Sequence, residues 1–179
     1  MKQIPISYEQ LHGHVLNILR QMIKDNWKPD YVVGITRGGL LPAALISQYL
    51  DIPMHTLKVT LRDSDSSFNC ESNCWMSEDA YGHIDYDPMV SSDGRKNILI
   101  VDDINDTGAT INWIRNDWQS NCAPDSERWN DIWHFNVRFA VIVNNLASEQ
   151  NIDYGSMEIN KVTDPSWVQF PTENWWHYA

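Results

Sequence analysis

Apolar residues recur at helical spacing near the start of the chain. They stand three or four residues apart at Leu11, Val15, Ile18, Leu19, Met22 and Ile23. A stripe with this period forms one face of an amphipathic helix. Ser7 and Gln10 precede it with the spacing of a capping box, and Pro29 follows it. The pattern therefore predicts a helix over residues 8–25.

Short runs of apolar and β-branched residues alternate with further helical segments along the rest of the chain. Runs typical of buried strands cover residues 31–35, 54–61, 97–103 and 137–143. Helices are predicted over residues 40–50 and 107–119. Strands that alternate with helices build right-handed βαβ units. We therefore expect an α/β fold, with a mostly parallel sheet flanked by helices, in which residues 1–179 form a single domain.

Two segments lack a regular period. We expect residues 62–96 to form a long flexible loop or insertion. We expect residues 146–179 to form a small C-terminal cap or hood that is continuous with the domain. Residues 63–94 contain eight Asp and Glu residues but no Lys or Arg, so the insertion would be an acidic lid. Two interpretations remain open: a solvated loop, or an ordered insertion that contributes to substrate choice or to contacts between copies. The second rests on its aromatic residues, Phe68, Trp75, Tyr81 and Tyr86.

Composition narrows the choice of partners. Thirteen Lys and Arg against 24 Asp and Glu give a net charge of 13 − 24 = −11, which argues against nucleic acid or an anionic membrane as the main partner. No apolar run approaches the roughly 20 residues of a transmembrane helix, and the N-terminus lacks the apolar stretch of a signal peptide. Three cysteines do not suggest a disulfide framework, and Cys70, Cys74 and His83 are one ligand short of a structural zinc site. We expect a cytoplasmic protein.

The strand predicted over residues 97–103 ends in two acids, Asp102 and Asp103. Open α/β folds bind their ligands at the carboxyl ends of the strands. Two adjacent carboxylates repel each other, and a sugar diol, a metal ion or water would satisfy them. Receiver-type phosphoacceptor domains also carry two acids at a strand end, but their separate phosphoacceptor Asp and Lys partner are not recognisable here.

A phosphate-binding turn follows the acid pair. Residues 106–110, with the sequence Asp-Thr-Gly-Ala-Thr, lead into the helix predicted over residues 107–119. The backbone N–H groups of a helix start, together with the hydroxyls, can hold a phosphate dianion. Gly108 has no side chain to block that approach.

Residues 101–110, with the sequence Val-Asp-Asp-Ile-Asn-Asp-Thr-Gly-Ala-Thr, resemble the phosphoribosyl pyrophosphate signature of type I phosphoribosyltransferases. Residues 33–39 resemble the family's pyrophosphate loop. Tyr154-Gly155 and residues 167–171 with Glu173 resemble the base-binding end of its xanthine–guanine and hypoxanthine branch. The resemblance implies a type I phosphoribosyltransferase fold and transfer of ribose 5-phosphate to guanine, xanthine or hypoxanthine. This is a nucleotide-salvage reaction that uses Mg²⁺ and releases pyrophosphate.

The same resemblance implies roles for individual residues. Asp106 would be the general base, and Asp102 and Asp103 would hold the ribose hydroxyls and the magnesium shell. The remaining phosphoribosyl pyrophosphate contacts would come from Thr107, Gly108, Ala109 and Thr110. The pyrophosphate contacts would come from Thr36, Arg37, Gly38 and Arg62. The base contacts would come from Asn145, Trp167 and Val168.

The chain departs from the family pattern at one position. Purine members carry a Lys that donates to the 6-oxo group of the base, at the end of the strand after the signature helix. Asn144 or Asn145 stands there in this chain. Three alternatives therefore remain open: a different acceptor base, loss of transferase activity, or a non-catalytic protein that binds phosphoribosyl pyrophosphate or a nucleotide.

Aromatic residues crowd the C-terminus at Trp175, Trp176 and His177. Aromatic side chains are enriched at protein interfaces. We therefore expect a homo-oligomer, a dimer or a tetramer.

Overall fold

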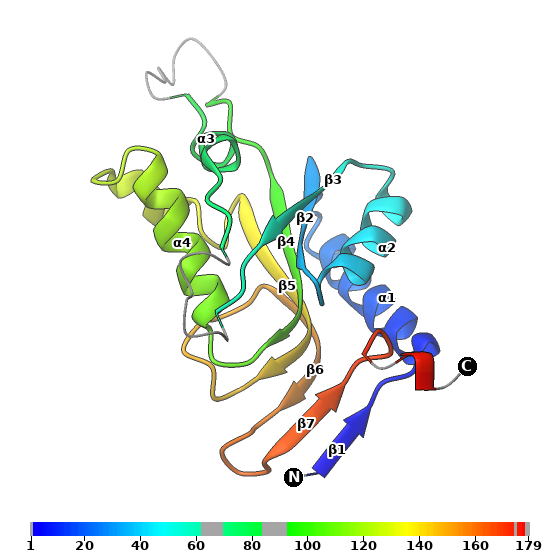
Figure 1. The fold of residues 1–179 in the computed structure, drawn as a ribbon. Coiled ribbons are helices and arrows are strands. Elements are labelled where there is room, and N and C mark those ends of the chain that lie inside the picture. The colour runs from blue at the N-terminus through cyan, green and yellow to red at the C-terminus, as the bar shows by residue number, and fades with distance from the viewer. Residues whose placement is uncertain (1, 62–69, 84–92, 174, 178–179) are drawn as a thin grey trace.

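The main element of the fold is a five-stranded parallel sheet (Figure 1). The computed structural model describes residues 2–61, 70–83, 93–173 and 175–177. Across the sheet, the strands are β3 (Met54–Lys58), β2 (Tyr31–Thr36), β4 (Ile98–Asn105), β5 (Val137–Asn145) and β6 (Tyr154–Ile159). The predicted α/β fold class with a mostly parallel sheet is confirmed.

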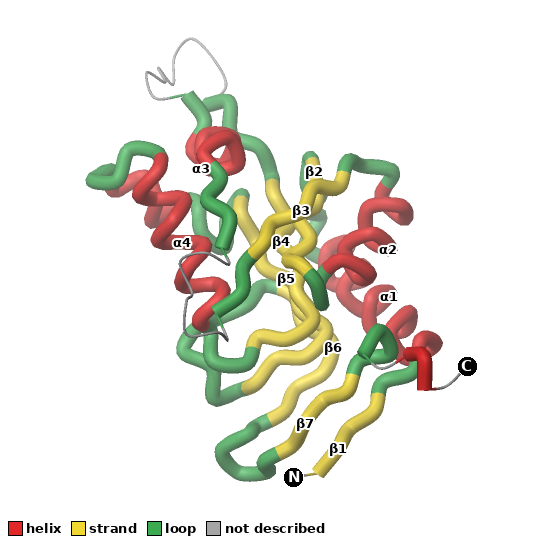
Figure 2. The backbone as a smooth tube through the Cα atoms, in the orientation of Figure 1, coloured by secondary structure: helices red, strands yellow, loops and turns green. Residues whose placement is uncertain are grey.

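Helices cover both faces of this sheet (Figures 1 and 2). One face carries α1 (Tyr8–Lys24) and α2 (Leu40–Leu50), and the other carries α3 (Cys74–Tyr81) and α4 (Ala109–Asn121). Along β2 the side chains alternate between the two layers. Val32 packs in the core under α1 and α2, whereas Val33 and Ile35 pack in the core under α3 and α4. Because both faces are buried, the strands read as continuous apolar runs in the sequence.

The first helix forms for the reasons that its sequence predicts. Ser7 Oγ accepts a hydrogen bond from the backbone N–H of Gln10, and the Gln10 side chain accepts one from the backbone N–H of Ser7. The buried face consists of Leu11, Val15, Ile18, Leu19 and Met22. Ile23 belongs to the predicted stripe but is 61% exposed, so the stripe is narrower than expected.

Other predicted boundaries move by up to three residues. The strand predicted over 54–61 ends at Lys58, and Val59 makes only an isolated antiparallel bridge with Cys70. The strand predicted over 97–103 continues to Asn105, because β4 pairs with β5 as far as Asn144. Helix α4 begins at Ala109, because Gly108 has a φ of 89° and caps the helix from outside.

Of the two interpretations of residues 62–96, the flexible loop is wrong for residues 74–81, which form α3. Asn73 caps this helix through its side chain, and Met76, Ala80 and Tyr81 are buried. Its short length and its buried Ala and Ser residues leave no apolar stripe in the sequence. Residues 62–69 and 84–92 lie outside the described residues, and so do four of the eight acids of the predicted lid.

The two ends of the chain meet in a second, two-stranded parallel sheet. It pairs β1 (Lys2–Pro5), which the sequence did not predict, with β7 (Ser166–Gln169). A short 3-10 helix, η3 (Trp175–His177), follows β7, and another, η2 (Glu127–Asp131), precedes β5. The irregular C-terminal segment therefore divides into an edge strand of the main sheet, β6, and a small hood formed by β1, β7 and η3 (Figure 1). In the described parts of the chain, no helix is long and apolar enough to span a membrane.

Candidate active site

Strand β4 delivers the acid pair to a cavity at the carboxyl edge of the sheet. Asp102 and Asp103 are half-buried and line this cavity of about 870 Å³. The Asp102 carboxylate accepts a 2.9 Å hydrogen bond from the Asp103 backbone N–H, and the Asp103 carboxylate accepts one of 2.9 Å from the Ile104 backbone N–H. These bonds orient both carboxylates along the end of the strand.

The loop after β2 lies directly against the acid pair. It runs through Arg37, Gly38 and Gly39 between β2 and α2, and the Thr36–Arg37 peptide bond is cis. A Cβ atom on Gly38 would overlap the carboxylate of Asp103, and one on Gly39 would overlap the backbone oxygen of Val101. Only glycine permits this close packing, which places two predicted ligand-binding segments side by side.

The turn at residues 106–110 has the geometry of a phosphate-binding helix start. Gly108 is buried, and a Cβ there would lie 2.8 Å from Cγ of Gln150. Glu149 donates its backbone N–H to the carbonyl of Thr107 at 3.2 Å, while Thr107 and Ala109 face solvent. The N-cap Gly108 has no side chain to cap α4, and the Ala109 N–H donates to the Thr107 hydroxyl at 3.3 Å. The remaining N–H groups of the first turn, together with that hydroxyl, suit an anion.

Arg115 holds Gln150, the residue that packs against Gly108 of this turn. Its guanidinium donates to the side-chain oxygen of Gln150 at 3.1 Å and lies over the ring of Trp133. Burial lowers the pKa of Arg115 from its ordinary value, although a guanidinium stays charged in proteins.

Asp106, the predicted general base, belongs to a polar cluster with Asn145 and Lys161. Lys161 Nζ lies 2.7 Å from Asp106 Oδ2. The Asn145 side-chain amide donates to the Asp106 carbonyl at 2.9 Å and to Asp106 Oδ1 at 3.3 Å. Lys161 Nζ also lies 5.8 Å from the centre of the Trp167 ring. The cluster therefore connects the predicted general base to the predicted base-binding strand β7.

Asn145 and Val168 face the protein interior. Asn145 is 5% exposed, and its Oδ1 accepts the backbone N–H groups of Ala147 and Lys161 at 3.2 and 3.1 Å. Val168 is also 5% exposed and pairs with Ile4 of β1. Trp167 is 41% exposed, which leaves ring surface for a ligand.

Ten of the predicted site residues line the 870 Å³ cavity. They are Thr36, Arg37, Gly38, Asp102, Asp103, Asp106, Thr107, Gly108, Ala109 and Thr110. Asn145, Trp167 and Val168 are not among its lining residues. Asn145 contacts the lining residue Asp106 directly, and Trp167 lies beside Lys161, which pairs with Asp106. Arg62 lies outside the described residues. The C-terminal segment adds Thr172, Glu173 and Trp176 to the lining.

Sequence reasoning missed Lys161. This residue lies in the turn between β6 and β7, within no motif, and 55 residues after Asp106. Its position six residues before Trp167 is the only signal in the sequence that could have linked it to the site.

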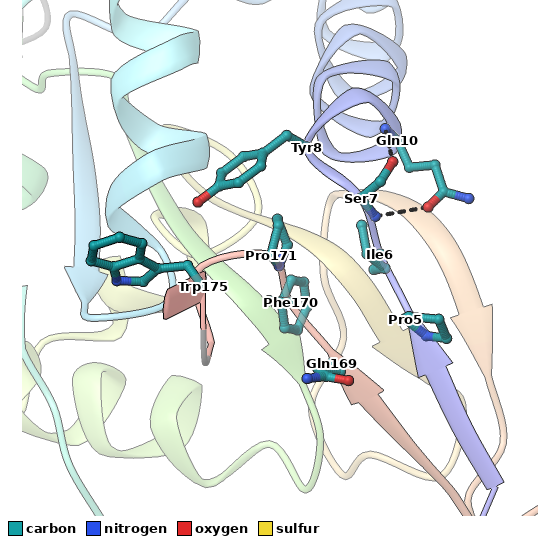
Figure 3. Close-up of a pocket in the computed structure, with 9 residues that line it drawn as sticks. All are labelled: Pro5, Ile6, Ser7, Tyr8, Gln10, Gln169, Phe170, Pro171 and Trp175. Atoms are coloured by element: carbon teal, nitrogen blue, oxygen red, sulfur yellow. Dashed lines mark hydrogen bonds between the residues drawn. The ribbon is translucent and has the colours of Figure 1, made fainter. Parts of the chain in front are cut away.

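A second cavity, of about 380 Å³, lies between the start of α1 and the segment after β7 (Figure 3). Its lining consists of Pro5, Ile6, Ser7, Tyr8, Gln10, Gln169, Phe170, Pro171 and Trp175. None of its lining residues has a predicted individual role, although Gln169, Phe170 and Pro171 belong to the segment that resembles the family's base-binding end. The chemistry therefore concentrates in the larger cavity.

The chain matches the family model of the phosphoribosyl transferase domain over residues 7–174. It belongs to the phosphoribosyl transferase family. Members of this family are pentosyltransferases, which places the chain among the enzymes.

Two curated relatives of this phosphoribosyltransferase match over most of their length. The hypoxanthine-guanine phosphoribosyltransferase of Schizosaccharomyces pombe is 22% identical over 187 residues, which cover 93% of this chain and 87% of that protein. The xanthine-guanine phosphoribosyltransferase of Nitratidesulfovibrio vulgaris is 26% identical over 176 residues, which cover 97% and 86%. Both relatives carry names of the branch that the sequence motifs indicate.

A solved structure shares the fold. The purine phosphoribosyltransferase from Pyrococcus horikoshii superposes with a TM-score of 0.64 at 19% identity, covering 97% of this chain and 96% of that one. The expected type I phosphoribosyltransferase fold is thereby confirmed.

Proposed function

We propose that this phosphoribosyltransferase transfers ribose 5-phosphate from phosphoribosyl pyrophosphate to a ring nitrogen of guanine, xanthine or hypoxanthine. The bond between the anomeric carbon and the pyrophosphate oxygen breaks, and a bond to the ring nitrogen forms. The base loses a proton, and pyrophosphate leaves. The products are a nucleoside monophosphate and pyrophosphate, as nucleotide salvage requires.

One observation carries this proposal: two anion-binding segments and an acid pair line the same cavity. The turn at residues 106–110 would hold the 5′-phosphate at the start of α4. Asp102 and Asp103 would accept hydrogen bonds from the ribose hydroxyls. The loop of Thr36, Arg37 and Gly38 would meet the pyrophosphate, together with Arg62 from outside the described residues. All three of these described segments line the same cavity, which would let one substrate contact them together.

The acid pair also suits Mg²⁺. This ion prefers oxygen ligands and usually binds through one or two carboxylates together with substrate phosphates and water. Asp102 and Asp103 supply two carboxylates in the cavity, and the described residues contain no group of three His, Cys, Asp or Glu side chains arranged to hold a metal by themselves. The donor set therefore fits a metal that arrives with its substrate. Such an ion would neutralise charge on the leaving pyrophosphate.

Asp106 would take the proton that the base loses. Its carboxylate faces Lys161, whose ammonium lies 5.8 Å from the centre of the Trp167 ring. That ring would stack on the purine while the Val168 backbone would meet the edge of the base. Asn145 would act on the base indirectly, since its amide bonds to Asp106 and to the Lys161 backbone. Negative charge from the carboxylates would stabilise the cationic sugar in the transition state.

The proposal includes a cytoplasmic location and self-association. Cys70, Cys74 and Cys122 are all free thiols, which suits a reducing compartment. Trp175 and Trp176 are 58% and 57% exposed, and exposed aromatic side chains are typical of interfaces. Sedimentation analysis of the purified protein would test the oligomeric state.

Pyrophosphate release tests the transferase activity. The assay contains phosphoribosyl pyrophosphate, Mg²⁺ and, one at a time, guanine, hypoxanthine, xanthine, adenine, uracil or orotate. We expect release with a 6-oxopurine, and a kcat lowered by roughly 100- to 10,000-fold in Asp106→Asn, because the general base is lost. Asp125→Asn is the matched control, since Asp125 is exposed in the turn after α4. Binding of phosphoribosyl pyrophosphate without release for any base would instead support a regulatory protein.

A further inference from the structure

The turn between β6 and β7 brings a cation to the candidate general base. Lys161 Nζ lies 2.7 Å from Asp106 Oδ2, and both side chains are partly exposed, at 22% and 34%. The pair thus borders on space that a ligand can reach. Trp167 marks the same place, because its ring centre lies 5.8 Å from Lys161 Nζ.

Hydrogen bonds hold the backbone of this turn in place. Asn160 Oδ1 accepts the backbone N–H groups of Val162 and Thr163 at 3.1 and 3.3 Å. On the other side, Asn145 Oδ1 accepts the backbone N–H of Lys161 at 3.1 Å while its amide donates to the Asp106 carbonyl. Asn145 is 5% exposed, so one buried amide sets the spacing between the two charged residues. A preorganised pair of this kind is suited to recognition, because little ordering remains to be done on binding.

The Asp106 carboxylate and the Lys161 ammonium offer complementary hydrogen-bonding groups side by side. A carboxylate accepts hydrogen bonds, and an ammonium only donates them. A heterocycle fits both when a ring N–H lies next to a ring carbonyl on the same edge, as N7–H and the 6-oxo group do in a 6-oxopurine. A 6-amino group at that place would point its own donors at the ammonium.

We propose that Lys161 is a specificity-determining residue that recognises the 6-oxo group of the acceptor base, and that Asn145 is the positioning residue that holds it beside Asp106. The inference rests on the proposed function and names the acceptor class of the same site. On binding, the base replaces the direct Lys161–Asp106 contact with two hydrogen bonds of its own. The cation therefore reaches the base from the β6–β7 turn and not from the end of β5.

Base preference tests Lys161 directly. Steady-state kinetics would compare the wild type, Lys161→Met and Lys161→Arg with hypoxanthine and with adenine. We expect Lys161→Met to lower kcat/KM for hypoxanthine by roughly 10- to 100-fold, the size of one hydrogen bond to a charged group. The KM for phosphoribosyl pyrophosphate and the weak use of adenine should stay unchanged. Lys161→Arg, which keeps a charged donor, should retain part of the preference.

The matched control is Lys2→Met. Lys2 forms an exposed ion pair with Asp164 of the same β6–β7 turn, at 3.2 Å, so its replacement removes the same charge and also breaks an ion pair of this turn. We expect this variant to keep the wild-type base profile. An active Lys161→Met enzyme with an unchanged ratio of hypoxanthine to adenine would overturn the inference.

Calorimetric binding of the nucleotides IMP and AMP separates this inference from the proposed function. We expect the wild type to bind IMP more tightly, and Lys161→Met to lose that difference. A protein that transfers to no base but keeps this Lys161-dependent preference would refute the transferase and retain the role of Lys161. Equal binding of both nucleotides by the wild type would overturn the inference whatever the activity.

Discussion

Gly38 shows at the scale of one residue why the site needs particular side chains. A Cβ atom on Gly38 would overlap the Asp103 carboxylate. The loop after β2 can therefore pack against the end of β4 only because residue 38 is glycine. The sequence marks Gly38 as part of a resemblance to a pyrophosphate loop. The structure adds the reason, which is contact between this loop and the acid pair.

Gly38→Ala should impair the use of phosphoribosyl pyrophosphate. The added methyl group must displace the Asp103 carboxylate or the loop, and a shift of about 1 Å in an active site can lower kcat/KM by roughly 100-fold. Gly13→Ala is the matched control, because a Cβ at Gly13 of α1 meets nothing within 4 Å. That variant should keep its kinetics and gain roughly 0.5–1 kcal/mol in free energy of unfolding. Equal kinetics for both variants would contradict this account of the loop.

Helix α3 shows at the scale of an element how tertiary contacts order a segment without a sequence pattern. Asn136, which is 3% exposed, donates from its amide to the carbonyls of Ala80 and Lys96, both at 2.9 Å. One side chain thus ties the end of α3 and the approach to β4 to the start of β5. Ser77 adds a hydrogen bond to the carbonyl of Trp118 in α4.

Asn136→Ala should therefore destabilise the protein by roughly 1–3 kcal/mol, because two buried carbonyl groups lose their donor. Urea unfolding followed by circular dichroism would measure the change. Asn116→Ala, on the exposed side of α4, is the comparison and should stay within about 0.5 kcal/mol of the wild type. If both variants unfold at the same urea concentration, α3 is not held by Asn136.

The whole molecule carries a net charge of −11, yet its proposed substrate is a polyanion. Long-range repulsion would oppose the approach of free phosphoribosyl pyrophosphate. Among the described residues, Arg37 is the cationic side chain that lines the cavity; Arg62 lies outside the described residues. Because this positive charge is small beside that of a polyanion, a metal complex of the substrate matches the acid pair better than the free substrate does.

Turnover should accordingly depend strictly on a divalent cation. We expect excess chelator to abolish pyrophosphate release and added Mg²⁺ to restore it, because the ion offsets charge on the substrate and the leaving group. Potassium chloride at matched ionic strength is the control and should not restore release. Circular dichroism in chelator would show whether the fold itself is unaffected. Undiminished turnover in chelator would refute the expectation.

The sequence by itself determined the elements whose signal is local. The capping box and apolar stripe of α1, the buried β4 run that ends in Asp102 and Asp103, and the turn around Gly108 all depend on neighbours within a few residues. Local hydrogen bonding and burial periodicity are enough to specify such features, and motifs made of them carried the family resemblance. The shifted ends of β3 and β4 and the shifted start of α4 depend on pairing with another strand or on the φ of one glycine.

Only the tertiary structure decided the contacts between distant segments. It paired β1 with β7, placed α3 on the sheet, and brought Lys161 to Asp106 across 55 residues of chain. The family resemblance predicts a lysine at the end of β5, where this chain has Asn144 and Asn145. The Asn145 side chain instead bonds to both partners of the ion pair. The number of residues between two side chains in the sequence does not show whether they meet in space. Packing and hydrogen bonds that form only in the complete fold bring these side chains together.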